Sequence, residues 1–325
     1  MDKVRCQTPQ TAYIETYPEA VKFAEQQFSI MWPPEEFPVA EDIHEVKTNT
    51  SDAEKHGVIT TLKLFTHYEL KAGVEYWGKR VMERYPRVCI QRMASQFSNA
   101  ELAMHAPFYN ELNKALDLDT EDFYNSYVED PVLNGRMEFI GECIGSDDDL
   151  LSLAVFSMVE GAVLYSAFAF LKHFRVGGKN MFKNLVSGIN ASVRDENLHS
   201  LGGAWLYKTH KEEAGKEGAE LEQLEGRINK AAELIYEHEK QIIAMLFEEG
   251  PIKGITATQL EHFVQSRINL CLQNLDMKPL YMVKYNPIAD WFYDNINALK
   301  LHDFFDTSGA DYKSTWKEEE FKIKW

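Results

Sequence analysis

Apolar residues recur every three or four positions along most of the chain, which is the spacing of an amphipathic helix. Strict alternation of apolar and polar residues, the pattern of a strand, is nearly absent. Breaks containing Gly or Pro, such as "YPRV", "VGGK" and "EEGPIKG", separate the apolar segments. The pattern predicts an all-α bundle of long helices, at about 17–30, 53–83, 88–116, 120–129, 148–173, 179–209, 218–249 and 257–277.

The two ends of the chain depart from this pattern. The stretch "WPPEEFPVAEDIHEVKTN" (32–49) is too rich in proline and acidic residues for a helix, so we expect an extended arm. The last residues, "DFFDTSGADYKSTWKEEEFKIKW", are polar and charged, as in a tail. We therefore divide the chain into an N-terminal arm with a short helix packed on the bundle (1–50), a helical domain (51–290) and a C-terminal tail (291–325).

The composition of the chain argues against several classes of binding partner and of metal site. The chain has 34 basic and 51 acidic residues, and the resulting net charge of −17 argues against a nucleic-acid or anionic-membrane surface. Its four cysteines lie far apart, with neither a disulfide pattern nor the spacing of a thiolate metal site. The N-terminus lacks the apolar core of a secretory signal, so we expect a cytoplasmic protein.

The most apolar segment is "LLSLAVFSMVEGAVLYSAFAFL" (150–171), which has the length of a transmembrane helix. Glu160 lies at its centre. A carboxylate there costs roughly several kcal/mol, in lipid or in a dry core, unless it is paired, protonated or bound to a metal. We therefore expect a buried core helix whose acid faces inward, and no membrane span.

Two other helices carry a glutamate and a histidine close together. "SVRDENLHS" contains Glu196 and His199, three residues apart, and "NAELAMHAPFY" contains Glu101 and His105, four residues apart. Either spacing places a carboxylate and an imidazole on one face of a helix, where both can bind one metal ion. Each pair taken alone is a weak signal, because single glutamates on helices are usually solvated.

Single acids on two further helices strengthen the interpretation of the Glu/His pairs as metal ligands. Glu160 is one of these acids, and Glu69, in the partly apolar "LFTHYELKAGVEYW", is the other. Two Glu/His pairs and two single carboxylates from four helices form the ligand set of a dinuclear carboxylate site in a four-helix bundle. Oxygen and imidazole donors suit iron or manganese.

Tyr109 lies one helical turn beyond His105, close to the expected metals. Leu164 and Phe168, one and two turns beyond Glu160, could surround its phenol with apolar side chains. Such a pocket would protect a long-lived oxidised tyrosine. A core tyrosine with a hydrogen-bonded hydroxyl fits the same spacing equally well.

Several motifs together resemble the small, radical-generating subunit of class I ribonucleotide reductase, a ferritin-like family. "VEGAVLYSAFAFLK" and "RDENLH" are similar to two of its metal-binding helices, and "MWPPEEF" is similar to its N-terminal W-x-P-E-E element. "DWFYDN" through "DFFDTSGADY" resembles its approach to a tail tyrosine. The resemblance covers most of the chain.

The resemblance implies that two metal ions, joined by an oxo or hydroxo bridge derived from O₂, oxidise Tyr109 to a stable radical. Iron is the first choice for both ions, and a pair containing manganese is the second. The implied ligands are Glu69, Glu101, His105, Glu160, Glu196 and His199.

The resemblance also implies a route for radical transfer. Trp32 and Asp195 would connect the metal site, through His105, to Tyr312 in the tail. A cysteine of a separate large subunit would then receive the oxidising equivalent and reduce a ribonucleotide, expected to be a diphosphate. The tail would dock on that large subunit, and the small subunit would form a homodimer.

The chain departs from the family in two places. The first metal ligand is usually Asp, whereas this chain has Glu69, as does a manganese- and iron-containing subgroup that lacks the tyrosine retained here. The family spaces the next Glu and His three apart, whereas Glu101 and His105 are four apart. A π-bulge can absorb the extra residue, and Pro107 favours one because it disrupts α-helical bonding. We predict a distorted helix between about residues 100 and 107.

Two other functions remain open from the sequence. A stand-alone oxidase or hydroxylase of the same bundle class would keep the metal site but need a substrate cavity. An iron-storage protein would self-assemble and need no tyrosine beside the metals. In a stand-alone oxidase or hydroxylase, Trp32 and the tail would have no role.

Overall fold

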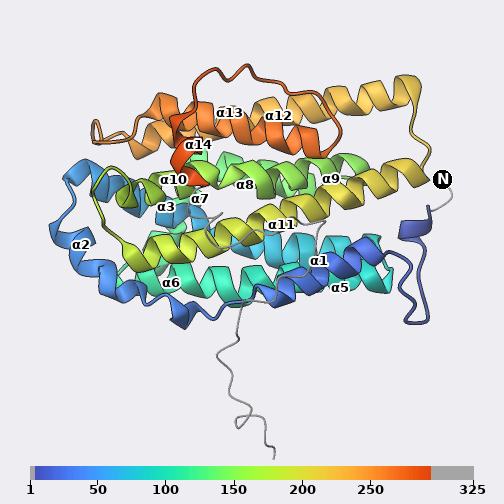
Figure 1. Cartoon of the computed structure of the whole chain (residues 1–325), viewed down its shortest axis with the longest axis horizontal. Helices are drawn as coiled ribbons and strands as arrows, with labels where there is room; N and C mark the ends of the chain where they lie inside the picture. The colour runs from blue at the N-terminus through green and yellow to red at the C-terminus, as the bar shows by residue number, and fades with distance from the viewer. Residues whose placement is uncertain (1–3, 294–325) are drawn as a thin grey trace, which may run out of the picture.

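The computed structural model describes residues 4–293, and within that range it contains helices and loops but no strand. The long helices lie side by side along the longest axis of the molecule (Figure 1). This confirms the all-α bundle that the spacing of apolar residues predicts.

Four helical stretches form the centre of the bundle, and three of them contain a π-helical segment. They pack on one another mainly through α5 with η4, α3 with α6, and α11 with α9 and η6. The stretches are α3 (Asp52–Leu70) with η4 (π, Lys71–Val81) and α4 (Met82–Arg84); α5 (Val88–Ala100) with η5 (π, Glu101–His105) and α6 (Ala106–Ala115); α9 (Asp149–Met158) with η6 (π, Val159–Val163) and α10 (Tyr165–Lys172); and α11 (Lys183–Glu213).

The remaining helices cover this centre. The first helix, α1, packs on α5, while α12 and α13 pair with each other and cover α3, α9 and α10 (Figure 1). α8 packs against α9 and α12, and α14 against α13. Their bounds are α1 (Pro18–Ser29), α2 (Ile43–Thr48), α7 (Glu121–Glu129), α8 (Pro131–Gly145), α12 (Gly218–Leu246), α13 (Ala257–Asn274) and α14 (Pro287–Phe292), with short 3₁₀ turns at η1 (Arg5–Gln7), η2 (Pro34–Glu36), η3 (Val39–Asp42) and η7 (His173–Arg175).

Side-chain caps fix where the key helices begin. The Ser51 side chain accepts a hydrogen bond from the Glu54 backbone, and Glu54 in turn accepts one from the Ser51 backbone, forming a capping box before α3. Asp148 accepts a hydrogen bond from the backbone of Leu151 at the start of α9. These caps satisfy backbone donors that a helix leaves free at its N-terminus.

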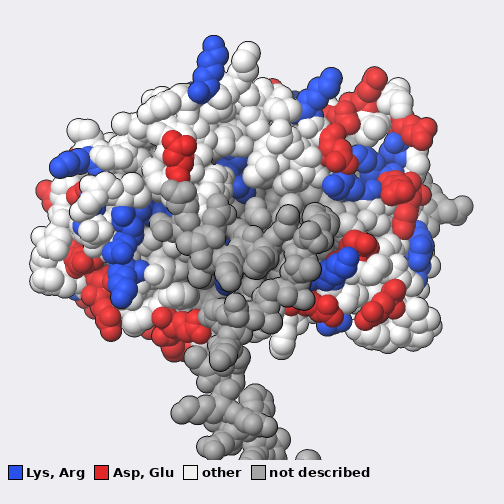
Figure 2. Space-filling model, viewed as in Figure 1, with Lys and Arg blue, Asp and Glu red and all other residues white. Residues whose placement is uncertain are grey.

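The stretch from Asp149 to Arg175 is the one helix in the described chain long and apolar enough to cross a membrane, and its most apolar window is completely buried in the protein. It is therefore a core helix here, as the central Glu160 predicts. The face seen in Figure 2 carries acidic and basic side chains interspersed over its described part.

The eight predicted helices are all present, but the prediction missed α8. Gly135, Gly141 and Gly145 weaken the helical signal of this segment, since glycine costs about 1 kcal/mol in a helix interior relative to alanine. Packing on α9 and α12 compensates for this cost. A local signal was present, because Asp130 caps α8 and Pro131 occupies its first turn.

Two boundaries also differ from the prediction. The arm at 32–49 is not fully extended, since α2 forms over Ile43–Thr48, beyond the last proline of that stretch. The helix predicted at 179–209 begins only at Lys183 and continues to Glu213. Asn180 and Phe182 have φ angles of 50° and 57°, in a left-handed conformation that cannot belong to an α-helix.

An ion pair is buried between the outer helices and the core. The Arg136 guanidinium on α8 pairs with the Glu239 carboxylate on α12, and both side chains are almost fully buried. The Ser166 hydroxyl on α10 donates a second hydrogen bond to Glu239. The contact joins three helices. Removing one charge would leave the other buried without a partner.

We expect Glu239→Ala to lower the free energy of unfolding by about 3–5 kcal/mol, because it leaves the Arg136 charge buried without its partner. Urea unfolding followed by circular dichroism measures the change. Glu237→Ala, two residues away on the exposed face of α12, is the control and should have little effect. Equal stabilities of the two variants would contradict the prediction.

Candidate metal centre

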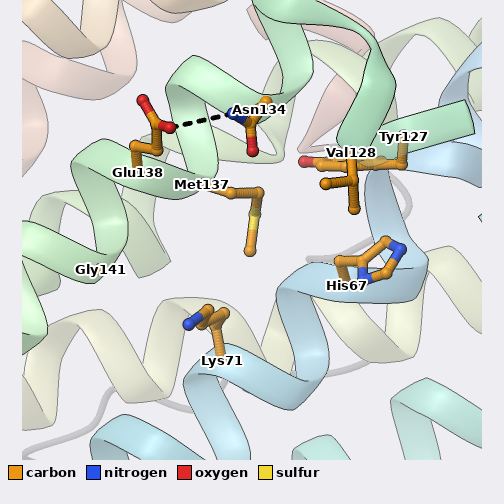
Figure 3. Close-up of a pocket in the computed structure, with 8 residues that line it drawn as sticks. All are labelled: His67, Lys71, Tyr127, Val128, Asn134, Met137, Glu138 and Gly141. Carbon is orange, nitrogen blue, oxygen red and sulfur yellow. Dashed lines mark hydrogen bonds between the residues drawn. The ribbon is translucent and has the colours of Figure 1, made fainter. Parts of the chain in front are cut away.

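Where α3 meets η4, at residues 67–71, side chains point to two opposite sides of the helix. His67 and Lys71 line a surface pocket of about 330 Å³ between α3, α7 and α8, which also contains Tyr127 and Met137 (Figure 3). Glu69, between them in the chain, is fully buried and points to the opposite side, into the bundle. The pocket is therefore separate from the carboxylates inside.

The π-helical segment η5 begins at Glu101 and ends at His105, which confirms the distortion predicted between residues 100 and 107. Pro107 follows directly, in the first turn of α6, where its missing N–H is tolerated. The wider π turn accommodates the additional residue between the two ligands. Both side chains consequently face the interior and are fully buried.

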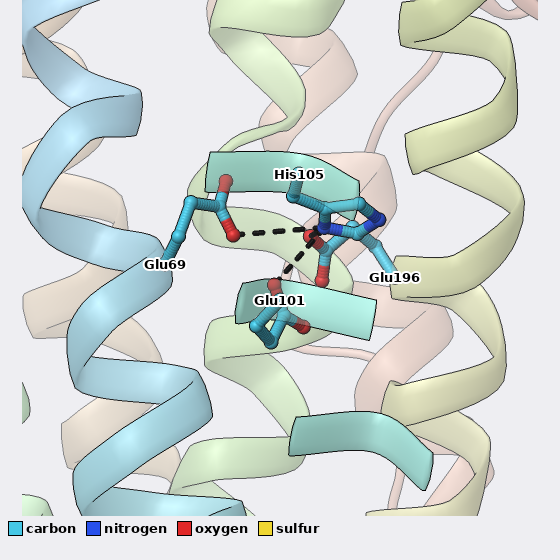
Figure 4. Close-up of side chains that lie close together, drawn as sticks. All are labelled: Glu69, Glu101, His105 and Glu196. Carbon is cyan, nitrogen blue, oxygen red and sulfur yellow. Dashed lines mark hydrogen bonds and ion pairs between the residues drawn. The ribbon is translucent and has the colours of Figure 1, made fainter. Parts of the chain in front are cut away.

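The structure brings all six predicted ligand residues together in two overlapping groups. Within each group, one donor atom from every residue lies within 4.8 Å of the others. The first group comes from α3, η5 and α11 and is drawn in Figure 4. The groups are Glu69, Glu101, His105 and Glu196, and Glu101, Glu160, Glu196 and His199. Glu101 and Glu196 are common to both groups, so they lie where two neighbouring metal ions could share them.

The two imidazoles approach the shared carboxylates through the same ring atom. The Nδ1 atom of His105 lies 3.0 Å from Glu101 and 3.3 Å from Glu196. The Nδ1 atom of His199 lies 2.7 Å from Glu101 and 3.8 Å from Glu196. Glu69 is 3.6 Å from His105 Nδ1. One nitrogen of each ring thus faces the centre of the cluster.

The donor set fits a pair of metal ions. Neither oxygen of Glu69 or of Glu196 has a hydrogen bond of normal geometry to a described residue, although both side chains are buried. Burial and the Glu101 charge raise the pKa of Glu69 well above its usual value. Burial and the Glu196 charge do the same to the pKa of Glu160. Bound cations would satisfy these oxygens and compensate their charges.

Burial acts to lower the pKa of both histidines, but nearby carboxylates outweigh it. The Glu101 charge raises the pKa of His105 well above its usual value, with Asp195 contributing a hydrogen bond. Glu101 also raises the pKa of His199, to about 9. In return, the His105 charge holds the pKa of Glu101 well below its usual value. Without metal, protons on the imidazoles partly replace the cations.

The outer nitrogens of the two histidines are joined by one hydrogen-bonded chain. His105 Nε2 lies 3.1 Å from Asp195, whose carboxylate also accepts a bond of 2.8 Å from the Trp32 indole. The Gln27 amide donates to Asp195 at 3.2 Å and lies 3.1 Å from His199 Nε2. Trp32 also stacks on the His105 ring, at 5.8 Å between centroids. The predicted grouping of Trp32, Asp195 and His105 therefore exists in the structure.

Sequence reasoning missed three residues around the ligands. Gln27 is one, although an amide on the apolar face of α1 was a usable signal. Tyr68 and Trp77 are the others, and both donate hydrogen bonds to Glu160. Nothing in their local sequence distinguishes these two from ordinary core aromatics.

Tyr109 is 1% exposed and lies among aromatic rings. Its ring stacks on Phe65 at 4.3 Å, and Phe65 stacks on Phe168 at 5.4 Å. Its hydroxyl has no hydrogen bond of normal geometry to a described residue. Burial, followed by the Glu69 charge, raises its pKa well above the usual value. Phe168 thus reaches Tyr109 through Phe65, which the sequence did not single out.

Tyr312 lies outside the residues that the structure describes.

The chain matches the family "Ribonucleotide reductase, small chain" over residues 12–287. It is 27% identical over 301 residues to "Probable ribonucleoside-diphosphate reductase small subunit 048L" of Invertebrate iridescent virus 3, covering 86% of this chain and 78% of that protein. The corresponding protein 376L of Invertebrate iridescent virus 6 is 22% identical over 348 residues, covering 93% of this chain and 95% of its own length.

The fold is similar to that of solved structures. The crystal structure of Streptococcus sanguinis dimanganese(II)-NrdF superposes with a TM-score of 0.75 at 18% identity, covering 87% of this chain and 98% of that one. At this identity the similarity concerns the fold, a ferritin-like bundle. The family match spans most of the chain and includes all six clustered residues that we predict as ligands, so the protein belongs to the small-chain family of ribonucleotide reductase.

Proposed function

We propose that the protein is the small subunit of a ribonucleoside-diphosphate reductase and generates the radical that its large subunit uses to reduce ribonucleotides. The observation that carries this proposal is the continuity between the carboxylate cluster and the hydrogen-bonded line from His105 through Asp195 to Trp32. A metal site alone would suit many functions. A metal site joined to a buried tryptophan suits electron transfer out of the bundle.

Six residues would hold two metal ions, with Glu101 and Glu196 shared between them. Glu69 and His105 would complete one position, and Glu160 and His199 the other. When bound, the metal ions would supply, after reaction with O₂, the oxidising power that removes an electron from a nearby tyrosine. Iron is our first choice and manganese our second, because the donor set suits both.

We assign Tyr109 as the oxidised residue. An oxidised phenol survives only where water and reductants are excluded, and Tyr109 is buried beneath Phe65 and one turn from His105. Ser192 is a polar neighbour of its hydroxyl and acts to lower its pKa, but no hydrogen bond of normal geometry fixes the hydroxyl in place. Burial among aromatic rings next to the proposed metal ligands is what supports the radical role over that of a core tyrosine.

The line from His105 to Trp32 would be the first part of the transfer route. Asp195 accepts hydrogen bonds from the Trp32 indole and the Gln27 amide, so its orientation is fixed from two sides. The route would continue to Tyr312 in the tail (291–325), which would dock on the large subunit. We further propose that the protein acts as a homodimer in the cytoplasm.

The alternative of a stand-alone oxidase or hydroxylase would need a substrate cavity beside the metals. The pocket of Figure 3 contains none of the six ligand residues, and neither does a second pocket of about 540 Å³ lined by α13 and residues 279–283. Neither of these two pockets therefore supports this alternative.

The first test is loading of the metal-free protein with iron(II) or manganese(II), followed by exposure to oxygen. We expect a tyrosyl radical signal by electron paramagnetic resonance, and we expect Tyr109→Phe to abolish it. Tyr207→Phe is the matched control, because Tyr207 is equally buried but about 12 Å along α11 from His199.

If neither iron(II) nor manganese(II) gives a radical signal, the result counts against the proposed activity. A signal of unchanged shape in Tyr109→Phe would instead assign the radical to another tyrosine and leave the metal site in place.

The second test concerns the transfer route. Tyr312→Phe should retain the radical on Tyr109 but abolish reduction of ribonucleoside diphosphates in the presence of the large subunit, because the route is interrupted outside the metal site. Tyr285→Phe, at a side chain that is 63% exposed, is the control and should retain turnover. Turnover by Tyr312→Phe would refute the role of that residue.

A further inference from the structure

Glu160 is held in place at both of its oxygens. The Tyr68 hydroxyl donates to Oε2 at 2.9 Å, and the Trp77 indole donates to Oε1 at 2.6 Å. We propose that Tyr68 and Trp77 are positioning residues that fix Glu160 for metal binding and thereby make the two metal positions unequal in affinity. This inference rests on the proposed dinuclear site.

Both donors come from one helical stretch. Tyr68 directly precedes Glu69 near the end of α3, and Trp77 follows nine residues later, within the π segment η4. A π segment shifts the face that later residues present, so both side chains can reach the same carboxylate on η6. Tyr68 is 1% exposed and Trp77 is fully buried, so both hydrogen bonds are shielded from bulk solvent.

The Trp77 indole is itself held by neighbouring rings. It makes edge contacts with Phe97 at 4.9 Å and with Tyr76 at 5.0 Å. It also meets the edge of His199 at 6.2 Å, so it contacts two ligand residues of the same metal position. Trp77 therefore cannot rotate away from Glu160 without displacing its neighbours.

Hydrogen bonding to Glu160 is not simply a consequence of burying a tyrosine. Tyr76 lies on the same stretch and is equally buried, yet its hydroxyl has no hydrogen bond to a described residue. Tyr165, on the helix that follows Glu160, has a buried hydroxyl that is likewise unpartnered there. The protein thus tolerates unpartnered tyrosines in its core but directs Tyr68 to the carboxylate.

The two metal positions differ in this respect. Glu160 has two fixed donors. Both histidines are held at Nε2, His199 by Gln27 and His105 by Asp195, so the histidines do not distinguish the two positions. Glu69, which occupies the corresponding place in the other position, has no hydrogen bond of normal geometry to a described residue at either oxygen. A ligand already oriented loses less conformational freedom when a metal binds. The position that contains Glu160 and His199 should therefore bind metal more tightly.

The test is titration of the metal-free full chain with manganese(II) by isothermal calorimetry. We expect two ions per chain, and we expect Tyr68→Phe and Trp77→Phe to weaken the tighter site about 10- to 100-fold while leaving the weaker site unchanged. Tyr76→Phe removes a hydroxyl from the same stretch and is the matched control. Its two affinities should equal those of the parent protein.

A spectroscopic readout separates positioning from general damage. With cobalt(II) at the tighter site, Tyr68→Phe should change the visible d–d bands, because the orientation of Glu160 changes, whereas Tyr76→Phe should not. Circular dichroism of the metal-free proteins checks folding. If Trp77→Phe does not fold, Tyr68→Phe still tests the positioning role, because it removes only one oxygen atom and should leave the fold intact.

The outcomes distinguish this inference from the function on which it rests. Two bound ions in the parent protein, with unchanged affinities and spectra in Tyr68→Phe, would overturn the positioning role and leave the dinuclear site standing. Equal loss at both sites would also overturn it. A parent protein that does not bind two ions would overturn the dinuclear site itself.

Discussion

Mutual repulsion of buried carboxylates is the constraint on which the rest of the structure depends. Glu69, Glu101, Glu160 and Glu196 lie together, buried from the solvent, where unit charges a few ångströms apart interact strongly. Burial raises the pKa of Glu69 and Glu160, so the metal-free cluster tends to hold protons. The surrounding side chains are arranged around this charge, since two imidazoles face it and neutral donors from Tyr68 and Trp77 bind one of its carboxylates.

The helices adapt to the cluster through their π segments. Glu101 and His105 begin and end η5, Glu160 lies within η6, and Glu69 lies just before η4. Glu69 on α3, and Glu196 and His199 on α11, come from regular α-helix. The wider π turn accommodates the four-residue spacing of Glu101 and His105. The irregular backbone is therefore part of how the sequence positions its ligands.

The sequence was sufficient for features that repeat along a helix. The period of apolar residues located the long helices, and the central place of Glu160 in the most apolar segment indicated that its carboxylate faces inward. The extra residue before His105, with Pro107 behind it, predicted the distortion that the structure contains. Contacts between distant segments could not be predicted in this way. Tyr68 and Trp77 lie 92 and 83 positions before Glu160, and only the folding of the whole bundle brings their side chains to it.

That separation has a consequence for how the chain is made. A segment as apolar as 149–175 is prone to aggregate while it is exposed, and it carries its central acid into the interior as it folds. During synthesis from the N-terminus, α3 and η4 precede this helix, so the hydroxyl and indole that receive Glu160 already exist when it emerges from the ribosome. The donors of Glu160 are thus made before it, whereas α11, α12 and α13, which cover most of this helix, are made afterwards, so it stays partly exposed until they emerge.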